Sequence, residues 1–388
     1  MTLEEAVKAR AVEIGFDLVG ITTADPFPEA DAAYQRWIEA GMHAGMAYMA
    51  AHRDRVGSPR RARPGARSIV AVAMNYYAGE PSPPQDGELR GRIARYAWGD
   101  DYHRVMETRL RALSGFLVAQ GATLAHYYVD TGPTLDRAIA QRAGLGWCGR
   151  HSCLITKSYG TWVVLGEILT DLALRPDPPA EGDCGLCWNC MHGSEACPTG
   201  AIVAPGVVDA RRCISYWTIE HRGWIPREVR PALQDMIFGC DLCQEACPFN
   251  RLARPTAHPE FRPRPEIGTH PRLLPLLNLS EADYHRLFRR SAVKRAGRSG
   301  LRRNVAVALG NLGDERAVPG LTAALGDPAD PVVRGHAAWA LGRIGGRAAR
   351  DALEAARRTE CDPAVAGEIQ AALEEGWEVP ARRESDYR

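Results

Sequence analysis

Eight cysteines between residues 184 and 247 stand in short, regularly spaced groups. They run as Cys184-x2-Cys187-x2-Cys190, then Cys197-Pro198, a single Cys213, and Cys240-x2-Cys243-x3-Cys247-Pro248. Ferredoxin-like proteins hold 4Fe–4S clusters with a Cys-x2-Cys-x2-Cys run and a more distant Cys-Pro, whose cysteine binds the other cluster. Thiolates are soft ligands that suit iron–sulfur chemistry. The spacing therefore predicts two iron–sulfur clusters.

The eight thiolates divide into two sets of four with none left over. We assign Cys184, Cys187, Cys190 and Cys247 to one cluster, and Cys197, Cys213, Cys240 and Cys243 to the other. Six residues separate Cys190 from Cys197, where a bacterial ferredoxin has an x3 spacing, so we expect a bulge over residues 191–196. Structural zinc is the alternative for paired Cys-x2-Cys motifs, but zinc does not account for two Cys-Pro closures.

The bulk composition is that of an ordinary globular protein. Of its 388 residues, 45% are hydrophobic and 24% are charged, and this length predicts two or three domains. A net charge of +1 gives no overall attraction to nucleic acid, so such binding needs a local patch. The N-terminus is amphipathic and unlike a signal peptide, and no apolar run is long enough to cross a membrane. We expect a cytoplasmic protein and, without an obvious self-association surface, a monomer.

Helical and strand-like patterns alternate over residues 1–175, which predicts an α/β (α+β) domain. The apolar runs that favour strands are short and are bounded by turn residues or by helical periodicity. We expect helices over residues 1–17, 102–120 and 135–143, and strands over 18–21, 68–74, 124–129 and 162–169.

Two further domains follow. A link with proline and glycine, residues 175–182, leads into a ferredoxin-like domain over residues 176–255. Residues 256–388 are predicted to be helical and contain a repeat, because 301–313 aligns with 333–345 at an offset of 32 residues. This period is typical of a short HEAT-like repeat. Two repeats rarely stand alone, so we expect them to dock on the cluster domain.

A second group of candidate residues follows the strand predicted over 124–129. Ligands bind at strand ends in α/β proteins, so Asp130 in Val129-Asp-Thr-Gly-Pro133 is placed to act in a pocket. The alternative is that Asp130 caps a helix beginning near Pro133. Gly144, Gly146 and Gly149 surround Trp147; they either let the backbone approach a large planar cofactor or form a turn.

Taken together, these motifs resemble those of the epoxyqueuosine reductases. The resemblance covers nearly the whole chain and rests on the cysteine pattern together with Val129-Asp-Thr-Gly-Pro133, Arg142-Ala-Gly-Leu-Gly-Trp147, Arg95-Tyr-Ala-Trp-Gly-Asp-Asp-Tyr-His103 and Arg302-Arg-Asn-Val-Ala-Val-Ala-Leu-Gly-Asn311. It implies a cobalamin-dependent oxidoreductase with two 4Fe–4S clusters that reduces epoxyqueuosine, at the wobble position of the tRNA anticodon, to queuosine. It also implies a core related to the reductive dehalogenases.

The resemblance also implies roles for individual residues. Asp130 matches the family's proton donor, which would protonate the departing oxygen as a general acid. The implied cobalamin pocket comprises Asp130 and an upstream arginine, either Arg53 or Arg55, together with Arg95, Tyr96, Tyr102, His103, Gly144, Gly146, Trp147 and Gly149. We do not assign His103 as a cobalt ligand, because Met106 stands where the D-x-H-x-x-G motif has glycine. Cys148, Cys153 and Cys361 have no cluster partners, and we treat them as structural.

Residues 286–303 carry a run of basic side chains without an acidic residue, which suits phosphate contacts. The run comprises Arg286, Arg289, Arg290, Lys294, Arg295, Arg298, Arg302 and Arg303. An exposed arginine-rich helix of no particular function is the alternative. Beside a HEAT-like scaffold and with the implied tRNA substrate, we expect this run to face RNA, through shape and backbone recognition with a splayed-out anticodon base.

Two other functions remain as alternatives. A cobalamin enzyme with the same clusters could reduce a small organohalide or epoxide, but such a substrate would not require the basic helical tail. An electron-transfer protein could use the clusters alone, which leaves Asp130 and the first 175 residues unexplained. The electron donor is not identified by the sequence in any of these cases.

Overall fold

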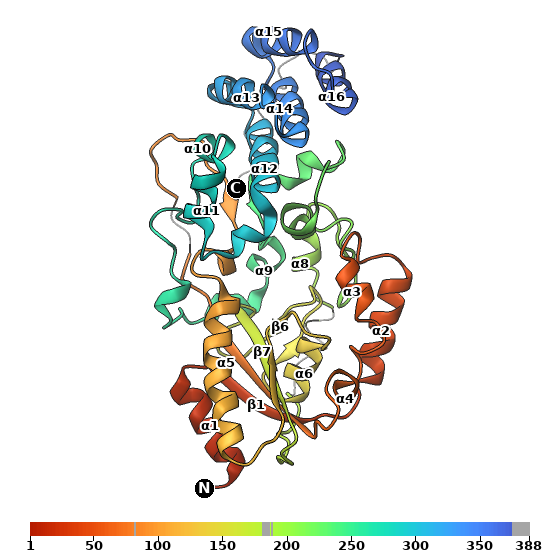
Figure 1. The fold of residues 1–388 in the computed structure, drawn as a ribbon, viewed down its shortest axis with the longest axis vertical. Coiled ribbons are helices and arrows are strands. Elements are labelled where there is room, and N and C mark those ends of the chain that lie inside the picture. The colour runs from red at the N-terminus through yellow and green to blue at the C-terminus, as the bar shows by residue number, and fades with distance from the viewer. Residues whose placement is uncertain (81–82, 181–186, 188, 375–388) are drawn as a thin grey trace. The chain divides into compact units, whose positions relative to one another are not determined.

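A computed structural model describes residues 1–80, 83–180, 187 and 189–374. Cys184 lies outside the described residues. The chain forms two units, each assembled from segments that are separated in sequence (Figure 1). The sequence predicts three consecutive domains instead, over residues 1–175, 176–255 and 256–388. The first unit comprises Met1–Glu80, Arg95–Cys213 and Asp241–Pro265, and the second comprises Pro81–Ala94, Ile214–Cys240 and Glu266–Arg388.

One four-stranded sheet organises the first unit. Its strands lie in the order β1-β2-β7-β4, and each neighbouring pair is antiparallel. The strands are β1 (Leu18–Thr23), β2 (Ser68–Asn75), β4 (Ala125–Tyr128) and β7 (Val163–Thr170). All four predicted strands are confirmed. Because the sheet is antiparallel, the rule that places ligands at the ends of parallel strands does not explain the position of Asp130.

Alternate residues of β2 face two different cores, as the two-residue period of a strand requires. Val70 and Val72 pack with residues of α1 (Leu3–Ile14) and α5 (Tyr102–Ala119). Ile69 and Ala71 pack on the other side with residues of α6 (Asp136–Arg142). The predicted helices are therefore confirmed as the two layers that cover the sheet (Figure 1). The remaining helices before β2 are α2 (Pro28–Glu39), α3 (Ala47–Ala51) and α4 (Pro59–Ala62).

The cysteine-rich part of the first unit contains little regular structure, as expected where tight turns must present thiolates. Residues 191–196, which the sequence analysis expects to bulge, contain the short helix α8 (His192–Glu195). The other short elements there are the hairpins β5 (Trp147–Cys148) with β6 (Leu154–Ile155) and β8 (Ile202–Ala204) with β9 (Val207–Val208), and the helix α9 (Leu242–Glu245).

Helices dominate the second unit, which also contains the parallel pair β3 (Arg92–Ile93) and β10 (Met236–Phe238). The predicted repeat is confirmed, since its two copies fall in α12 and α14. A Cβ atom on Gly310 would lie 2.7 Å from Cζ3 of Trp339, so this glycine lets the two repeat helices pack closely. The helices are α10 (Leu273–Leu277), α11 (Glu281–Phe288), α12 (Gly297–Leu312), α13 (Val318–Leu325), α14 (Pro331–Ile344), α15 (Gly346–Arg357) and α16 (Pro363–Glu374).

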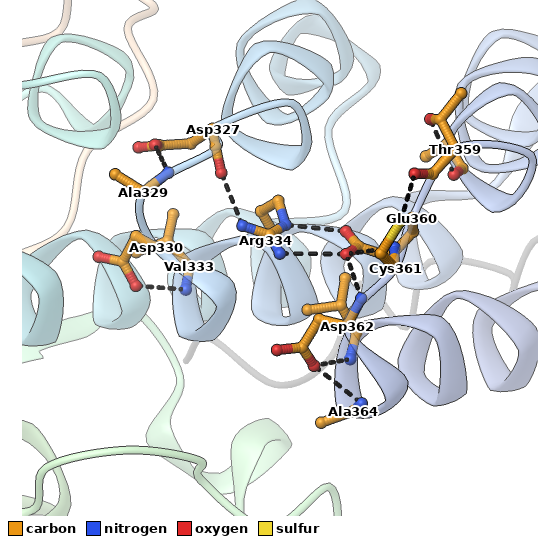
Figure 2. Close-up of polar contacts among 12 residues, drawn as sticks. Asp327, Ala329, Asp330, Val333, Arg334, Thr359, Glu360, Cys361, Asp362 and Ala364 are labelled. Atoms are coloured by element: carbon orange, nitrogen blue, oxygen red, sulfur yellow. Dashed lines mark hydrogen bonds and ion pairs between the residues drawn. The ribbon is translucent and has the colours of Figure 1, made fainter.

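An ion pair links the loops between successive repeat helices. Arg334 donates to Glu360 at 2.8 and 3.1 Å and to the carbonyl oxygen of Asp327 at 2.8 Å (Figure 2). Glu360 also accepts hydrogen bonds from the backbone N–H groups of Cys361 and Asp362. Charge-assisted bidentate bonds of this kind fix geometry as well as adding stability. Cys361 is exposed beside this ion pair.

Two arginines of the predicted RNA-binding run are interior residues. Arg303 is 1% exposed and donates to the carbonyl oxygens of Trp217, His221 and Gly223 at 2.7–3.0 Å. Burial lowers its pKa to about 9. Arg302 is 3% exposed; it donates to the carbonyl oxygen of Leu277 and forms an ion pair with Asp327 at 2.6 Å. The prediction that Arg302 and Arg303 face RNA is wrong, because their guanidinium groups are enclosed by protein.

Replacing Arg303 by methionine should destabilise the second unit by about 3 kcal/mol, because buried carbonyl oxygens lose a charged donor. Arg289, which is exposed, provides the matched control, and its replacement by methionine should leave stability unchanged. The measurement is the urea midpoint followed by circular dichroism. Equal midpoints for the two variants would show that the interior hydrogen bonds of Arg303 contribute nothing net.

Candidate functional site

Three of the predicted cluster ligands converge on one cavity of the first unit. The cavity has a volume of about 420 Å³, and Cys187, Cys190 and Cys247 line it. Cys247 is 60 positions beyond Cys187 in the chain, so the fold brings together the thiols that the assignment requires. Trp147, Ile155 and Phe249 pack against Cys187 and Cys247 as an apolar wall. Soft thiols in a cavity of this size fit a 4Fe–4S cluster.

The thiols of this cavity lie in surroundings that disfavour their charged form when no metal is bound. Burial, together with the neighbouring Cys187 and Cys190, raises the pKa of Cys247 to about 11. A bound iron atom would supply the positive charge that keeps such a thiol ionised. The backbone N–H of Arg150 donates to Sγ of Cys187 at 3.4 Å, which orients that ligand.

The second predicted ligand set comprises Cys197, Cys213, Cys240 and Cys243. Cys197, Cys213 and Cys243 belong to the first unit, and Cys240 ends a segment of the second. Burial alone would raise the pKa of Cys197, but hydrogen bonds from Thr199 and from the backbone N–H of Ala201 lower it overall. This thiol is therefore held ready to ionise. The membership of the second cluster stays a prediction.

A separate polar network lies beyond β4. Nε2 of His103 donates to Oδ1 of Asp130 at 2.9 Å, and the hydroxyl of Tyr102 donates to Oδ2. Nδ1 of His103 donates to Asp101 at 2.8 Å. Because both ring nitrogens face carboxylate acceptors, the imidazole carries two protons. Burial opposes the charge, but the hydrogen bonds to Asp101 and Asp130 outweigh it and raise the pKa of His103 to about 9.

Asp130 is not a helix cap. The helix that follows, α6, begins at Asp136 with Leu135 at its N-cap, and no side chain caps it. Both carboxylate oxygens of Asp130 are instead occupied by Tyr102 and His103. Asp130 also adopts a φ of +46°, a conformation that non-glycine residues rarely occupy and that clusters at functional sites. The capping alternative is therefore wrong.

Two carboxyl groups anchor the loop that carries Asp130. The hydroxyl of Thr134 lies 2.6 Å from Oε1 of Glu167 and 3.0 Å from Oδ1 of Asp136. One hydroxyl has one hydrogen and serves only one acceptor, so the other contact requires a proton on a carboxyl group. Burial raises the pKa of both Glu167 and Asp136, and the charge of Asp130 adds to the effect. The loop is thus tied to the buried strand β7 by a protonated carboxyl.

The two candidate arginines have different surroundings. Arg53 donates to Gln35 at 3.1 Å and pairs with Glu39 on α2 at 3.5 Å. Nη2 of Arg55 lies 3.3 Å from Nδ1 of His52. Both arginines are exposed, and the assignment of one of them to the pocket stays a prediction.

Other predicted pocket residues divide between the network and the protein interior. Tyr96 packs edge-to-face on Tyr102, with ring centroids 5.7 Å apart, and so belongs with the network. The side chain of Arg95 is 2% exposed. It forms ion pairs with Glu80 and Glu245 and donates a hydrogen bond to the carbonyl oxygen of Gly79. Arg95 therefore supports the fold and does not reach Asp130 through its guanidinium group.

The glycines around Trp147 have internal reasons to be glycine. A Cβ atom on Gly146 would lie 2.2 Å from the carbonyl oxygen of Ile155, and one on Gly144 would lie 2.8 Å from that of Pro178. On Gly149 it would lie 2.8 Å from Cε1 of His151. These contacts favour the alternative in which Gly144, Gly146 and Gly149 shape a turn of the chain.

Sequence reasoning missed Asp101 and Glu167 as parts of the site. Asp101 is the N-cap of α5. Its hydrogen bond with the imidazole depends on the position of the His103 ring, which the sequence does not give. Glu167 offered a usable signal, because it is the one acidic residue within the apolar run Val163-Val-Leu-Gly-Glu-Ile-Leu169. A charged residue in a buried strand is rarely there without a partner.

The exposed part of the basic run lies in the second unit around the end of α11. Arg286 pairs with Asp283 and Arg295 with Glu220, each on the surface. Arg298 is partly buried and donates to the carbonyl oxygen of Leu279 at 2.7 Å. The exposed members of the run are Arg286, Arg289, Arg290, Lys294 and Arg295.

Comparison with known proteins agrees with these features. The model for Epoxyqueuosine reductase QueG, DUF1730 matches residues 57–131, the 4Fe-4S double cluster binding domain matches 183–250, and HEAT repeats match 288–374. The epoxyqueuosine reductase of Salmonella typhimurium is 42% identical, with 80% of each chain covered. The chain belongs to the epoxyqueuosine reductase family. This family membership makes it an oxidoreductase with an iron–sulfur domain and HEAT repeats, and the zinc alternative is set aside.

Solved structures of the family share the whole fold. An epoxyqueuosine reductase crystallised with an epoxyqueuosine-modified tRNA-Tyr stem loop has 36% identity and a TM-score of 0.90, over 96% of this chain and 98% of that one. The Bacillus subtilis epoxyqueuosine reductase with its catalytic aspartate loop swung out of the active site has 35% identity and a TM-score of 0.88, with the same coverage. Among the described residues of this family member, no helix is both long and apolar enough to span a membrane.

The charge state of His103 is open to direct measurement. Replacing Asp101 by asparagine keeps a good N-cap for α5 but removes one carboxylate from the ring. The pKa of His103 should fall from about 9 towards its ordinary value of roughly 6.5, as measured by NMR of histidine ring nitrogens. An unchanged pKa in the variant would mean that Asp101 does not hold the imidazolium.

Proposed function

We propose that this protein reduces epoxyqueuosine to queuosine at the wobble position of tRNA. The observation that carries the proposal is the Asp130 network, found in a member of the epoxyqueuosine reductase family that also has the double-cluster domain. A relative of the same fold binds an epoxyqueuosine-modified stem loop, which supports tRNA as the substrate. The double-cluster domain would supply electrons, and the Asp130 network a proton, to the same reaction.

Removal of an epoxide oxygen needs two electrons and two protons, which release the oxygen as water and leave a carbon–carbon double bond. The two clusters, with the ligand sets assigned above, would deliver the electrons one at a time. Asp130 would protonate the departing oxygen as a general acid. Both oxygens of Asp130 accept hydrogen bonds at rest, so the proton that it passes on is drawn from the imidazolium of His103.

Cobalamin is the proposed cofactor at the carbon centre. When bound, it supplies a strongly reducing cobalt that can react with carbon. Tyr96, Tyr102 and His103 would line its site together with Arg53 or Arg55, and the exposed side of Asp130 would face the substrate. The ring nitrogens of His103 are both occupied by carboxylates, which agrees with not assigning this residue as a cobalt ligand. The Tyr96–Tyr102 pair offers an aromatic surface suited to a flat macrocycle.

The tRNA backbone would contact the exposed basic residues of the second unit, namely Arg286, Arg289, Arg290, Lys294 and Arg295. Cations on a helical scaffold suit backbone recognition, while the modified base is splayed out into the site. An organohalide reductase or a simple electron carrier would have no use for this surface. We further propose that the protein acts as a cytoplasmic monomer supplied by a separate electron donor.

Anaerobic turnover tests the role of Asp130. The protein with reconstituted clusters, cobalamin and a strong reductant should convert epoxyqueuosine-containing tRNA to a nucleoside lighter by about 16 mass units, read by mass spectrometry. Asp130→Asn should lower the rate by about 10²–10⁴-fold, the usual contribution of a general acid. Asp25→Asn is the matched control, since Asp25 is an exposed surface ion-pair partner of Arg60. Full turnover by Asp130→Asn would leave the acid role without support.

The pH dependence tests His103 separately. A raised pKa means that the ring is protonated below about 9, so the rate should fall as pH rises through that value. The stability that the imidazolium contributes is fully present below the ordinary histidine pKa of roughly 6.5 and is lost as pH rises from there through about 9. His103→Gln should lower the rate and abolish this alkaline limb. If the limb persists in the variant, another group supplies the proton.

Binding measurements test the basic surface. Neutralising Arg289, Arg290 and Lys294 together with alanine should weaken tRNA affinity and reduce the slope of log K against log salt by about one per lost phosphate contact. The triple replacement of Arg347, Arg350 and Arg357, all exposed on α15, is the matched control. Equal affinity and salt slope in the two triple variants would place the RNA elsewhere.

A further inference from the structure

His151 stands in the wall of the thiol cavity with one ring nitrogen unused. The side chain is 7% exposed and lines the same cavity as Cys187, Cys190 and Cys247. Its Nε2 atom is buried and has no hydrogen-bond partner in the described part of the chain. Buried polar groups are almost always hydrogen-bonded, so an orphan of this kind points to a missing partner.

The proton on this ring is assigned by its other nitrogen. The backbone N–H of Cys153 donates to Nδ1 of His151 at 3.2 Å. A backbone amide is only a donor, so Nδ1 acts as the acceptor and carries no hydrogen. The hydrogen of the neutral ring is therefore on Nε2, and the unused group is an N–H donor.

Two glycines leave room for the ring at this place. A Cβ atom on Gly149 would lie 2.8 Å from Cε1 of His151, and one on Gly193 would lie 3.4 Å from Cδ2. Alanine at position 149 would thus press on the ring. The absence of side chains at these two positions therefore leaves the imidazole the space that it occupies.

We propose that His151 donates an Nε2–H hydrogen bond to a sulfur atom of the 4Fe–4S cluster held by Cys184, Cys187, Cys190 and Cys247, and thereby raises the reduction potential of that cluster. The proposal rests on the ligand set of the proposed function. A reduced cluster carries one more negative charge, so a donor aimed at its sulfur stabilises the reduced form more than the oxidised form. Hydrogen bonds to the sulfurs are among the main determinants of cluster potential.

His192 provides a contrast within the same cavity. It also lines the cavity, but its side chain is exposed, so water can satisfy its ring nitrogens. Its replacement should change the cluster far less than the replacement of His151. A comparison of the two histidines therefore distinguishes the effect of a buried hydrogen-bond donor from the effect of lying near the cluster.

A redox titration monitored by electron paramagnetic resonance tests the proposal. His151→Leu removes the donor, and one of the two cluster potentials should become more negative while the other stays unchanged. His151→Gln keeps an N–H donor of similar reach and should restore much of the shift, whereas His192→Leu should leave both potentials in place. Unchanged potentials in His151→Leu at full iron content would overturn the proposal.

A second measurement covers the case in which His151→Leu fails to assemble its clusters. In protein labelled with ¹⁵N-histidine, pulsed resonance of the reduced cluster should show a histidine nitrogen coupling and an exchangeable proton, both retained in His192→Leu. Their absence in a protein with both clusters present would overturn the hydrogen bond. Neither experiment uses cobalamin or tRNA, so a failure here is distinct from a failure of epoxyqueuosine reduction.

Discussion

A protonated carboxyl on the buried strand β7 decides where the loop that carries Asp130 can lie. Glu167 is 1% exposed and shares the hydroxyl of Thr134 with Asp136. Since one hydroxyl hydrogen cannot serve two acceptors, this contact holds only while a carboxyl group keeps its proton. Burial raises the pKa of both acids and maintains that state. The strained conformation of Asp130, a few residues away, is thereby supported by the core of the sheet.

Carboxyl groups meet different partners in this short stretch of protein. Glu167 and Asp136 share the hydroxyl of Thr134, and burial raises the pKa of both. Asp101 and Asp130 instead accept hydrogen bonds from the two ring nitrogens of His103, and these bonds raise the pKa of the ring. The arrangement keeps the proton that fixes the loop apart from the protons on His103.

Burial also divides residues that look alike in sequence. Arg302 and Arg303 belong to the same basic run as Arg289 and Arg290, yet the first two satisfy interior carbonyl oxygens and an aspartate. His151 and His192 line one cavity, but only His151 is enclosed. In each pair the residue type defines the available chemistry. Burial gives Arg302 and Arg303 partners within the protein, and it removes the Nε2–H group of His151 from water.

The sequence by itself determined the local features: the cysteine spacing, the helices and strands, and the repeat in α12 and α14. These follow from short-range periodicity and turn chemistry, which need no knowledge of distant contacts. Tertiary structure alone decided that Asp130 faces His103 and caps no helix, and that Arg302 and Arg303 are interior. Each of these depends on residues far apart in the chain, whose burial and partners arise only when the sheet and helices pack.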